Sequence, residues 1–367
     1  MNITRRHSMM FPPICRLIFP FGVMGLMQPS VVEADQIVTE AQNHPDAGIV
    51  RLEGGRLQFR DRAGQLQSAW IHRIGLIVMD RAGAFTDFNQ AERFLAGGEP
   101  ARAIPRYRRA MRLLDDFWPE LIAARLTTAC DQAEQVDQAV SNLLIVLEGF
   151  FTGPPAAARL IPRRIPSDPD GKVLRALDQL NAVLTRELPE SHRTLLTLVR
   201  YEMLGRIGDE RVRSAAKEVA VLPIPADIRS ERVYQIQHEA LGRVLQEGVN
   251  PDALAGLDRA IRDAPESLLP DFLLLKGWMS LRAAASREDI LRASWPFLRA
   301  AIHFPDDERA AEGLYGAASA LERAGLTDQA VELLTECLES ERLGDKTRRQ
   351  AESALKRLRE REQDDYP

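Results

Sequence analysis

The six histidines are the residues of this chain best suited to metal or acid–base chemistry, and their spacing argues against both. They are His7, His44, His72, His192, His238 and His303. None has a second histidine or a cysteine three or four residues away, the spacing at which one helix places two ligands on the same ion. Glu239 follows His238, but the rest of a zinc-protease helix is absent. We therefore expect isolated surface or groove histidines and no metal site.

One acidic cluster has the beginning of a calcium loop. Asp168 and Asp170 precede Gly171, but the third acidic position is Lys172 and no glutamate closes the loop. A turn that caps a helix beginning near Lys172 explains these residues better. The chain also lacks the G-x-S-x-G, phosphate-loop and strand-linked G-x-G-x-x-G patterns. The sequence thus predicts no catalytic residue, no cofactor and no enzymatic activity.

The three cysteines do not form a ligand set or a disulfide framework. Cys15 falls in an apolar N-terminal stretch and lacks the context of a lipoprotein cysteine, while Cys130 and Cys337 are far apart in the sequence. Both occupy positions that other segments fill with small or apolar residues. We expect them to be small core residues.

A recurring spacing indicates the helices that would position any site. In each instance a small residue is followed four positions later by a large apolar residue and three positions after that by another small residue. The four instances are Ala103, Tyr107 and Ala110; Ala253, Leu257 and Ala260; Ala293, Phe297 and Ala300; and Ala330, Leu334 and Cys337. In three of them a glycine stands five residues upstream, at Gly98, Gly248 and Gly325. Small residues let two helices approach closely, and the large one fills the gap to the next hairpin. The spacing predicts a mainly α protein built as an αα-hairpin solenoid.

These residues resemble the tetratricopeptide (TPR) repeat, whose signature ends in A-x3-F and then P. Ala293, Phe297 and Pro305 fit that ending, and Ala253 with Pro265 fits with Leu257 in place of the aromatic. No repeat carries the first-helix tryptophan, and the successive alanines are more widely spaced than in the family. The resemblance implies a scaffold that binds another protein or peptide along its concave face.

The repeat register divides the helical part into sub-arrays. Hairpin units are expected at residues 84–117, 120–153, 234–267, 268–307 and 311–344, within the blocks 84–153 and 227–344. A proline-rich linker at 154–170 and irregular helical hairpins at 171–226 separate the two blocks. A polar capping helix at 345–362 and a disordered tail at 363–367 complete the chain.

Between residues 35 and 82 the periodicity changes to the alternation of β-strands. Short strands are expected around 35–37, 49–52, 56–59, 65–70 and 73–78, with turns at Gly54-Gly55 and at 61–64. The segment resembles a small Sm-like or SH3-like β module of the kind that precedes TPR arrays in some exported bacterial proteins. It is either a ligand or assembly module or an N-terminal cap for the solenoid.

The first 34 residues look like an imperfect signal peptide. Arg5 and Arg6 precede an apolar stretch at 14–27, and Val32-Glu33-Ala34 has the form of a cleavage site. We expect export to the periplasm with cleavage near Ala34; the alternative is an uncleaved membrane anchor, which would be the only membrane contact. With a net charge of −5, the chain shows no nucleic-acid signature.

Candidate partner-binding residues lie on the first helices of the hairpins. They are Phe85, Phe88, Glu92, His238, Glu312, Tyr315 and Glu322. Exposed aromatics among carboxylates suit a peptide or a partner helix. For Phe85 and Phe88, packing against the β module is an equal alternative. The functional expectation is a non-enzymatic scaffold in the cell envelope; its rival is a small-ligand or glycan module in the β segment that the helices support.

Overall fold

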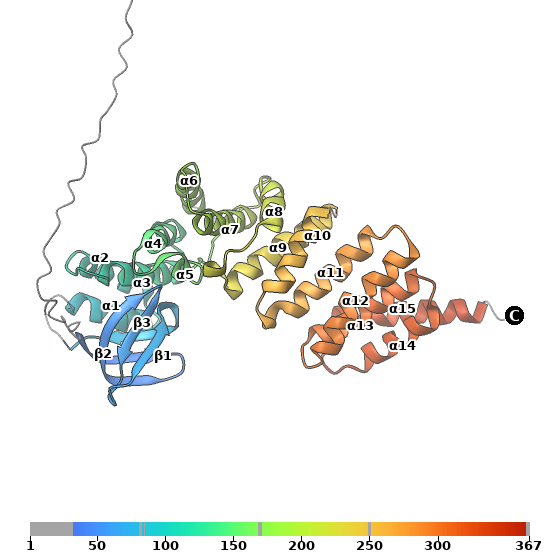
Figure 1. Ribbon diagram of the computed structural model, residues 1–367, viewed down its shortest axis with the longest axis horizontal. Coiled ribbons are helices and arrows are strands. Elements are labelled where there is room, and N and C mark those ends of the chain that lie inside the picture. Colours follow the sequence, from blue (N-terminus) through green and yellow to red (C-terminus); the bar gives the residue numbers. More distant parts are fainter. Residues whose placement is uncertain (1–31, 81–82, 84, 168–170, 249–250, 365–367) are drawn as a thin grey trace, which may run out of the picture.

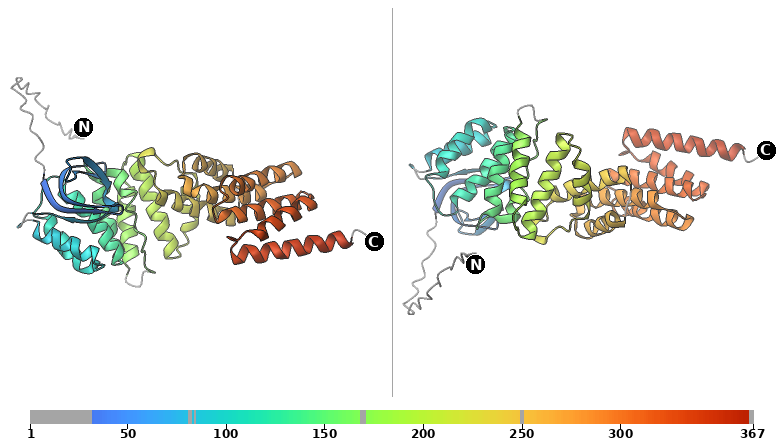
Figure 2. Two further views of the ribbon diagram at one scale, coloured as in Figure 1. Left: turned by 90° about the horizontal axis from the view of Figure 1, so that it is seen from below. Right: turned by 90° about the horizontal axis from the view of Figure 1, so that it is seen from above.

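The chain forms an elongated, mainly α structure with a small β-sheet at one end (Figure 1). The computed structural model describes residues 32–80, 83, 85–167, 171–248 and 251–364. Helices follow one another in a row away from the sheet, and the last helix lies at the opposite end of the molecule (Figures 1 and 2). The predicted fold class is confirmed. Within the described residues, no helix combines the length and apolar character needed to cross a bilayer.

The N-terminal sheet has five antiparallel strands in the order β4-β3-β2-β1-β5. They are β1 (Val32–Thr39), β2 (Asn43–Glu53), β3 (Arg56–Arg60), β4 (Leu66–Trp70) and β5 (Ile74–Val78). Gly54 and Gly55, at φ 55° and 78°, make the left-handed turn between β2 and β3 that only glycine adopts easily. In β3, Leu57 and Phe59 are buried while the residues between and beside them are not, so one face points into the core. The predicted strands are confirmed.

Two hairpins pack directly beside the sheet, and four less regular helices follow. The hairpins are α1 (Thr86–Ala96) with α2 (Pro100–Met111) and α3 (Trp118–Gln132) with α4 (Val136–Glu148). A short α5 (Gly153–Ala157) then leads to α6 (Lys172–Leu184), α7 (Glu190–Arg206) and α8 (Val212–Val221). The sheet and the helices as far as α11 share one continuous apolar core.

The second block contains three hairpins and a final helix. The hairpins are α9 (Glu231–Glu247) with α10 (Pro251–Asp263), α11 (Leu269–Ala283) with α12 (Arg287–His303), and α13 (Arg309–Arg323) with α14 (Thr327–Glu339). The helix α15 (Asp345–Asp364) packs Leu355 and Leu358 onto the end of the array. Beyond α11 the core divides into smaller clusters.

The repeat positions do what their spacing predicts. All twelve small and large residues of the four instances are buried, and Gly98, Gly248 and Gly325 have the positive φ values of helix-ending turns. Phe297 shows the packing: its ring occupies the space that a Cβ on Gly277 of α11 or on Gly316 of α13 would need. Cys130 and Cys337 are buried and unbridged, as expected.

The proline-rich segment is not a free linker. It includes most of α5, and the residues just before it are held by Glu120 of α3, whose carboxylate accepts hydrogen bonds from the backbone N–H groups of Phe150, Phe151 and Thr152 at 3.0, 2.8 and 3.0 Å. Gly55 of the β2–β3 turn also donates its N–H to the Phe151 carbonyl at 3.1 Å. The segment therefore attaches the sheet to the helices.

Helix ends differ from the sequence-based ranges in a few places. The predicted tail at 363–367 is wrong at its start, since α15 continues through Asp364 with no glycine or proline to stop it. Helix α10 begins at Pro251, and α12 begins with a capping box formed by Ser286 and Asp289. The acidic cluster at Asp168 and Asp170 and residues 1–31 of the predicted signal peptide lie outside the described residues.

Candidate functional site

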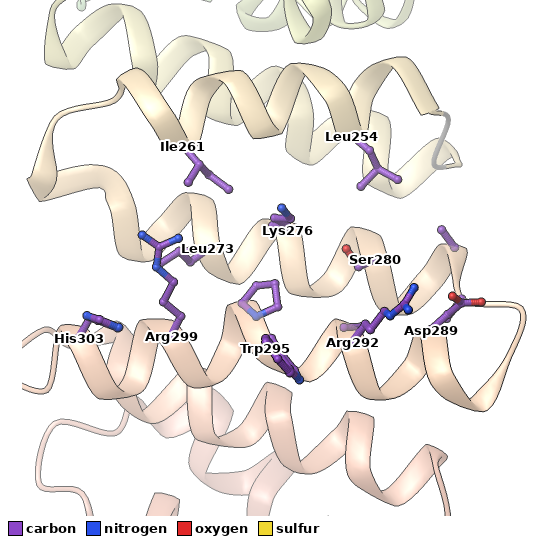
Figure 3. Close-up of a pocket in the computed structure, with 14 residues that line it drawn as sticks. Leu254, Ile261, Leu273, Lys276, Ser280, Asp289, Arg292, Trp295, Arg299 and His303 are labelled. Carbon is purple, nitrogen blue, oxygen red and sulfur yellow. The ribbon is translucent and has the colours of Figure 1, made fainter.

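A groove of about 1030 Å³ opens between α10 and α12, with α11 between them (Figure 3). Leu254 and Ile261 of α10 form one apolar wall, and Leu273 of α11 lies in the floor. The two α10 residues are seven positions apart and therefore lie two turns apart on the same helix face. The groove is thus a cleft along the second helices of two successive hairpins.

The opposite wall is a stripe of α12. Arg292, Pro296, Arg299 and His303 follow one another at intervals of four, three and four residues, which places them on one face. Trp295 lies beside this stripe and is 74% exposed. It cannot reach the core because Ala293, Phe297 and Ala300 already occupy the buried face of α12.

The charged side chains around the groove differ in whether they form ion pairs. Lys276 of α11 pairs with Asp258 of α10, and Arg292 pairs with Glu288 one turn earlier on its own helix. Among the residues that the structure describes, Arg299 has no hydrogen-bond or ion-pair partner. Asp289, the acidic residue of the lining, is held in the capping box, where the hydroxyl of Ser286 lowers its pKa. The groove therefore presents a net positive wall beside an apolar one.

This arrangement suits binding rather than covalent chemistry. Ser280 and His303 both line the groove, but they lie towards its opposite ends and cannot form a nucleophile–base pair (Figure 3). Within the described part of the chain, no cluster of three or more His, Cys, Asp or Glu side chains could hold a metal ion.

The structure buries three of the predicted partner-binding residues in its N-terminal part. Phe88 and Glu92 are fully buried and Phe85 is nearly so, so none of them presents a partner surface. Phe85 and Phe88 pack edge-on against Trp118 at ring-centroid distances of 4.9 and 5.3 Å. The rings around Phe85 and Phe88 belong to α2 and α3, so both residues are part of the core of the first two hairpins.

Glu92 is the centre of a buried polar network that joins helix to sheet. Its carboxylate accepts hydrogen bonds from Arg125 at 2.7 and 2.8 Å and from the N–H of Ile77 in β5 at 2.8 Å. Arg125 also donates to the carbonyls of Ile74 and Gly75 at 2.5 and 3.1 Å, and the Tyr107 hydroxyl donates to Glu92. Burial and the nearby Glu92 charge raise the Tyr107 pKa well above its usual value.

The other four predicted residues are scattered along the second block. His238 on α9 is partly buried edge-on to Phe272, and burial lowers its pKa. Tyr315 on α13 is partly buried beside Trp278, and Glu312 is exposed. Glu322 is engaged by α15, since its carboxylate contacts Arg357 at 3.0 Å and Arg361 at 3.6 Å. None of the four lines the groove.

The aromatic that the β module could offer to a sugar is already covered. The guanidinium groups of Arg56 and Arg159 both lie over the ring of Trp70, at 5.0 and 3.8 Å from its centroid. Arg159 comes from the proline-rich segment, so the covering depends on how that segment folds back. Trp70 is therefore a packing residue that joins two parts of the chain.

Sequence reasoning missed the groove although one signal for it was present. If Ala293, Phe297 and Ala300 face the core, Trp295 must point away from it, since two residues turn a helix by about 200°. A tryptophan on that outer face, between two arginines, is the pattern of a contact surface. The separation of α10 from α12, in contrast, has no local sequence signal.

Comparison with known families and with curated proteins gives no match to this chain.

Proposed function

We propose that this protein is a non-enzymatic scaffold that binds another protein or peptide in the α10–α12 groove. The observation that carries the proposal is Trp295, a large aromatic that is mostly exposed at an apolar groove flanked by arginines. Tryptophan and arginine dominate the binding energy of protein interfaces, and exposed aromatics in clefts mark contact sites. The resemblance to the TPR repeat supports the same class of function.

The site differs from the one that the resemblance implies. TPR-type binding would use the first helices, where His238, Glu312 and Tyr315 lie, whereas the groove is formed largely by the second helices α10 and α12. Two of those three side chains rest partly buried against aromatic neighbours. The groove combines an apolar wall with the exposed ring of Trp295, and we assign it as the binding site on that ground.

Export to the periplasm, with cleavage near Ala34, belongs to the same proposal. Such cleavage would leave residues 35–39 of β1, of which Gln36, Ile37 and Val38 pair with both β2 and β5. Ile37, fully buried in the sheet, would also remain. The shortened strand would keep its place between its two neighbours.

The rival proposal, a small-ligand or glycan module in the β segment, has less support. Its candidate aromatic, Trp70, is partly buried and is covered by Arg56 and Arg159. The buried Glu92–Arg125 pair and the proline-rich segment instead join the sheet to the helices. These contacts favour the sheet as a cap of the solenoid.

A site-specific crosslinker tests the proposal. A photoreactive amino acid at position 295 of the full chain, activated in the native host, should give one or a few discrete protein adducts identifiable by mass spectrometry. Leu113, which is 61% exposed beyond the end of α2, is the matched control position. Equal labelling from both positions, or none from position 295, would overturn the assignment of the groove.

A further inference from the structure

We infer that the groove takes an acidic amphipathic helix, one with an apolar stripe beside a row of carboxylates. This inference rests on the proposed function, which supplies the site, and it adds the chemistry of the partner. It is carried by three properties of the groove: its length and cross-section, its one-sided apolar lining, and its unpaired cation.

The dimensions fit one face of a helix. From Asp289 to His303 the lined stripe of α12 is about 21 Å long at the rise of an α-helix. A helix of that length has about 14 residues and, at a diameter of about 10–12 Å, roughly twice the volume of the groove. A partner helix would therefore bury one face in the groove and leave the other face in solvent, which is how amphipathic helices bind.

The apolar lining lies on one side of the groove. Leu254 and Ile261 of α10 are spaced by two helical turns, and Leu273 of α11 lies in the floor; Trp295 is the aromatic of the opposite helix, α12 (Figure 3). This spacing matches side chains at i, i+3 or i+4, and i+7 of a docked helix. Trp295, uncovered in the free protein, gains the most burial in the complex.

The charge of the opposite wall selects acidic residues. Arg299 has no partner among the described residues, and its guanidinium reaches towards α10 along the groove (Figure 3). Arg292 and Lys276 have partners exposed enough to be exchanged for a ligand carboxylate. Asp289, the acidic lining residue, is committed to its cap. Arginine forks bind carboxylates in bidentate fashion, and a groove with excess cations accepts acidic helices and rejects basic ones.

A nucleic acid could also bind these cationic side chains, but the groove favours it less than an acidic helix. The chain carries a net charge of −5, and the wall facing the arginines is aliphatic rather than polar. Polyanion sites spread positive charge over a surface and need no such wall.

The test measures binding of labelled peptides to the full-length chain by fluorescence anisotropy. The probe is a helix of about 14 residues with leucines at i, i+3, i+4 and i+7 and glutamates flanking them. One comparison peptide has lysine at every glutamate position, and another has the same composition in scrambled order. We expect the acidic helix to bind at least about tenfold more tightly than either comparison peptide, with affinity falling as salt rises.

Variants connect that binding to the groove. Arg299→Glu should weaken the acidic helix by about tenfold or more and improve binding of the lysine peptide, and Trp295→Ala should weaken the acidic helix to a similar extent. Ile302→Ala is the matched control, because Ile302 is exposed on α12 but does not line the groove. Circular dichroism would confirm that each variant is folded.

The outcomes separate this inference from the proposed function. Equal binding of acidic and basic helices, or binding that ignores Arg299→Glu and Trp295→Ala, would overturn the inference. If position 295 still crosslinks to a discrete protein, the groove is the site but its occupant has another chemistry. A crosslinked product of twice the chain's mass would identify a second copy as the occupant and also overturn the inference. Preference for an oligonucleotide over the acidic helix would do the same.

Discussion

The two ends of this molecule use the same αα-hairpin unit with opposite results. Where α1 and α3 meet the sheet, even charged side chains are buried, and Glu92 and Arg125 satisfy one another and the backbone of β5. Where α10, α11 and α12 meet, cations and a tryptophan remain at the surface. The difference lies in what covers each helix face: the sheet closes the first region, and within the described residues nothing closes the second.

This comparison shows why a residue type does not by itself mark a site. Phe88 and Trp295 are both aromatics on repeat helices, but one is enclosed by Tyr107 and Trp118 and the other is uncovered. A buried ion pair gains little net energy over an apolar pair, yet it fixes where the sheet docks. An unpaired surface arginine costs little and remains available to a ligand.

Arg125→Met should have the largest effect on stability. It leaves the Glu92 carboxylate buried without its counter-charge, which costs about 3–5 kcal/mol of the free energy of unfolding. Urea denaturation measures this loss. Arg357→Met, which breaks the more exposed pair with Glu322, should cost at most about 1 kcal/mol. Similar losses in both variants would mean that the Glu92–Arg125 pair contributes no more to stability than the Glu322–Arg357 pair.

An almost equally large loss is expected for Trp118→Ala, at about 3–5 kcal/mol, because this ring is buried among Phe85, Phe88 and Phe117. Trp295→Ala should change stability by no more than about 0.5 kcal/mol, since its ring is mostly exposed. The same urea titrations compare them. A large loss for Trp295→Ala would show that this residue supports the fold and would weaken its assignment as a contact residue.

Gly277→Ala tests the close packing within the second region. A Cβ on Gly277 would stand 2.5 Å from ring carbons of Phe297, so overpacking should cost about 1–3 kcal/mol. Gly242→Ala in α9 is the matched control, because nothing lies within 4 Å of its added Cβ. That change should stabilise the protein by about 0.4–1 kcal/mol through a stiffer unfolded chain. Changes of the same sign would contradict the packing of α11 against α12.

A smaller effect should appear on acidification of the sheet region. Burial, and then the charges of Arg159, Arg73 and Arg163, lower the pKa of His72 from 6.5 to about 4. Between these values the unfolded chain binds a proton that the folded chain excludes, so the free energy of unfolding falls as pH falls through this window. His72→Gln should lose less stability than the parent between about pH 7 and pH 5. Parallel losses in thermal melts would contradict the predicted linkage.

The repeat part of the fold could be predicted closely because its signals are local. The spacing of Ala293, Phe297 and Ala300 predicts which face of a helix is buried, and Gly325 predicts where one helix ends. The β-strands could be predicted equally well from the alternation of apolar and polar residues and from the turn residues Gly54 and Gly55. The candidate site was harder to predict, since three of the seven chosen residues are buried and the groove was not foreseen.

By itself, then, the sequence determined the hairpins, the strands and their turns, because each depends on contacts between residues a few positions apart. Tertiary structure decided which helix faces are covered by other parts of the chain. Whether Glu92 is a surface carboxylate or the buried partner of Arg125 depends on β5, and whether Trp70 is free depends on Arg159, far along the chain. The groove likewise exists only because α10 and α12 lie apart across α11 (Figure 3). Burial is set by segments distant in sequence, and no local pattern encodes their approach.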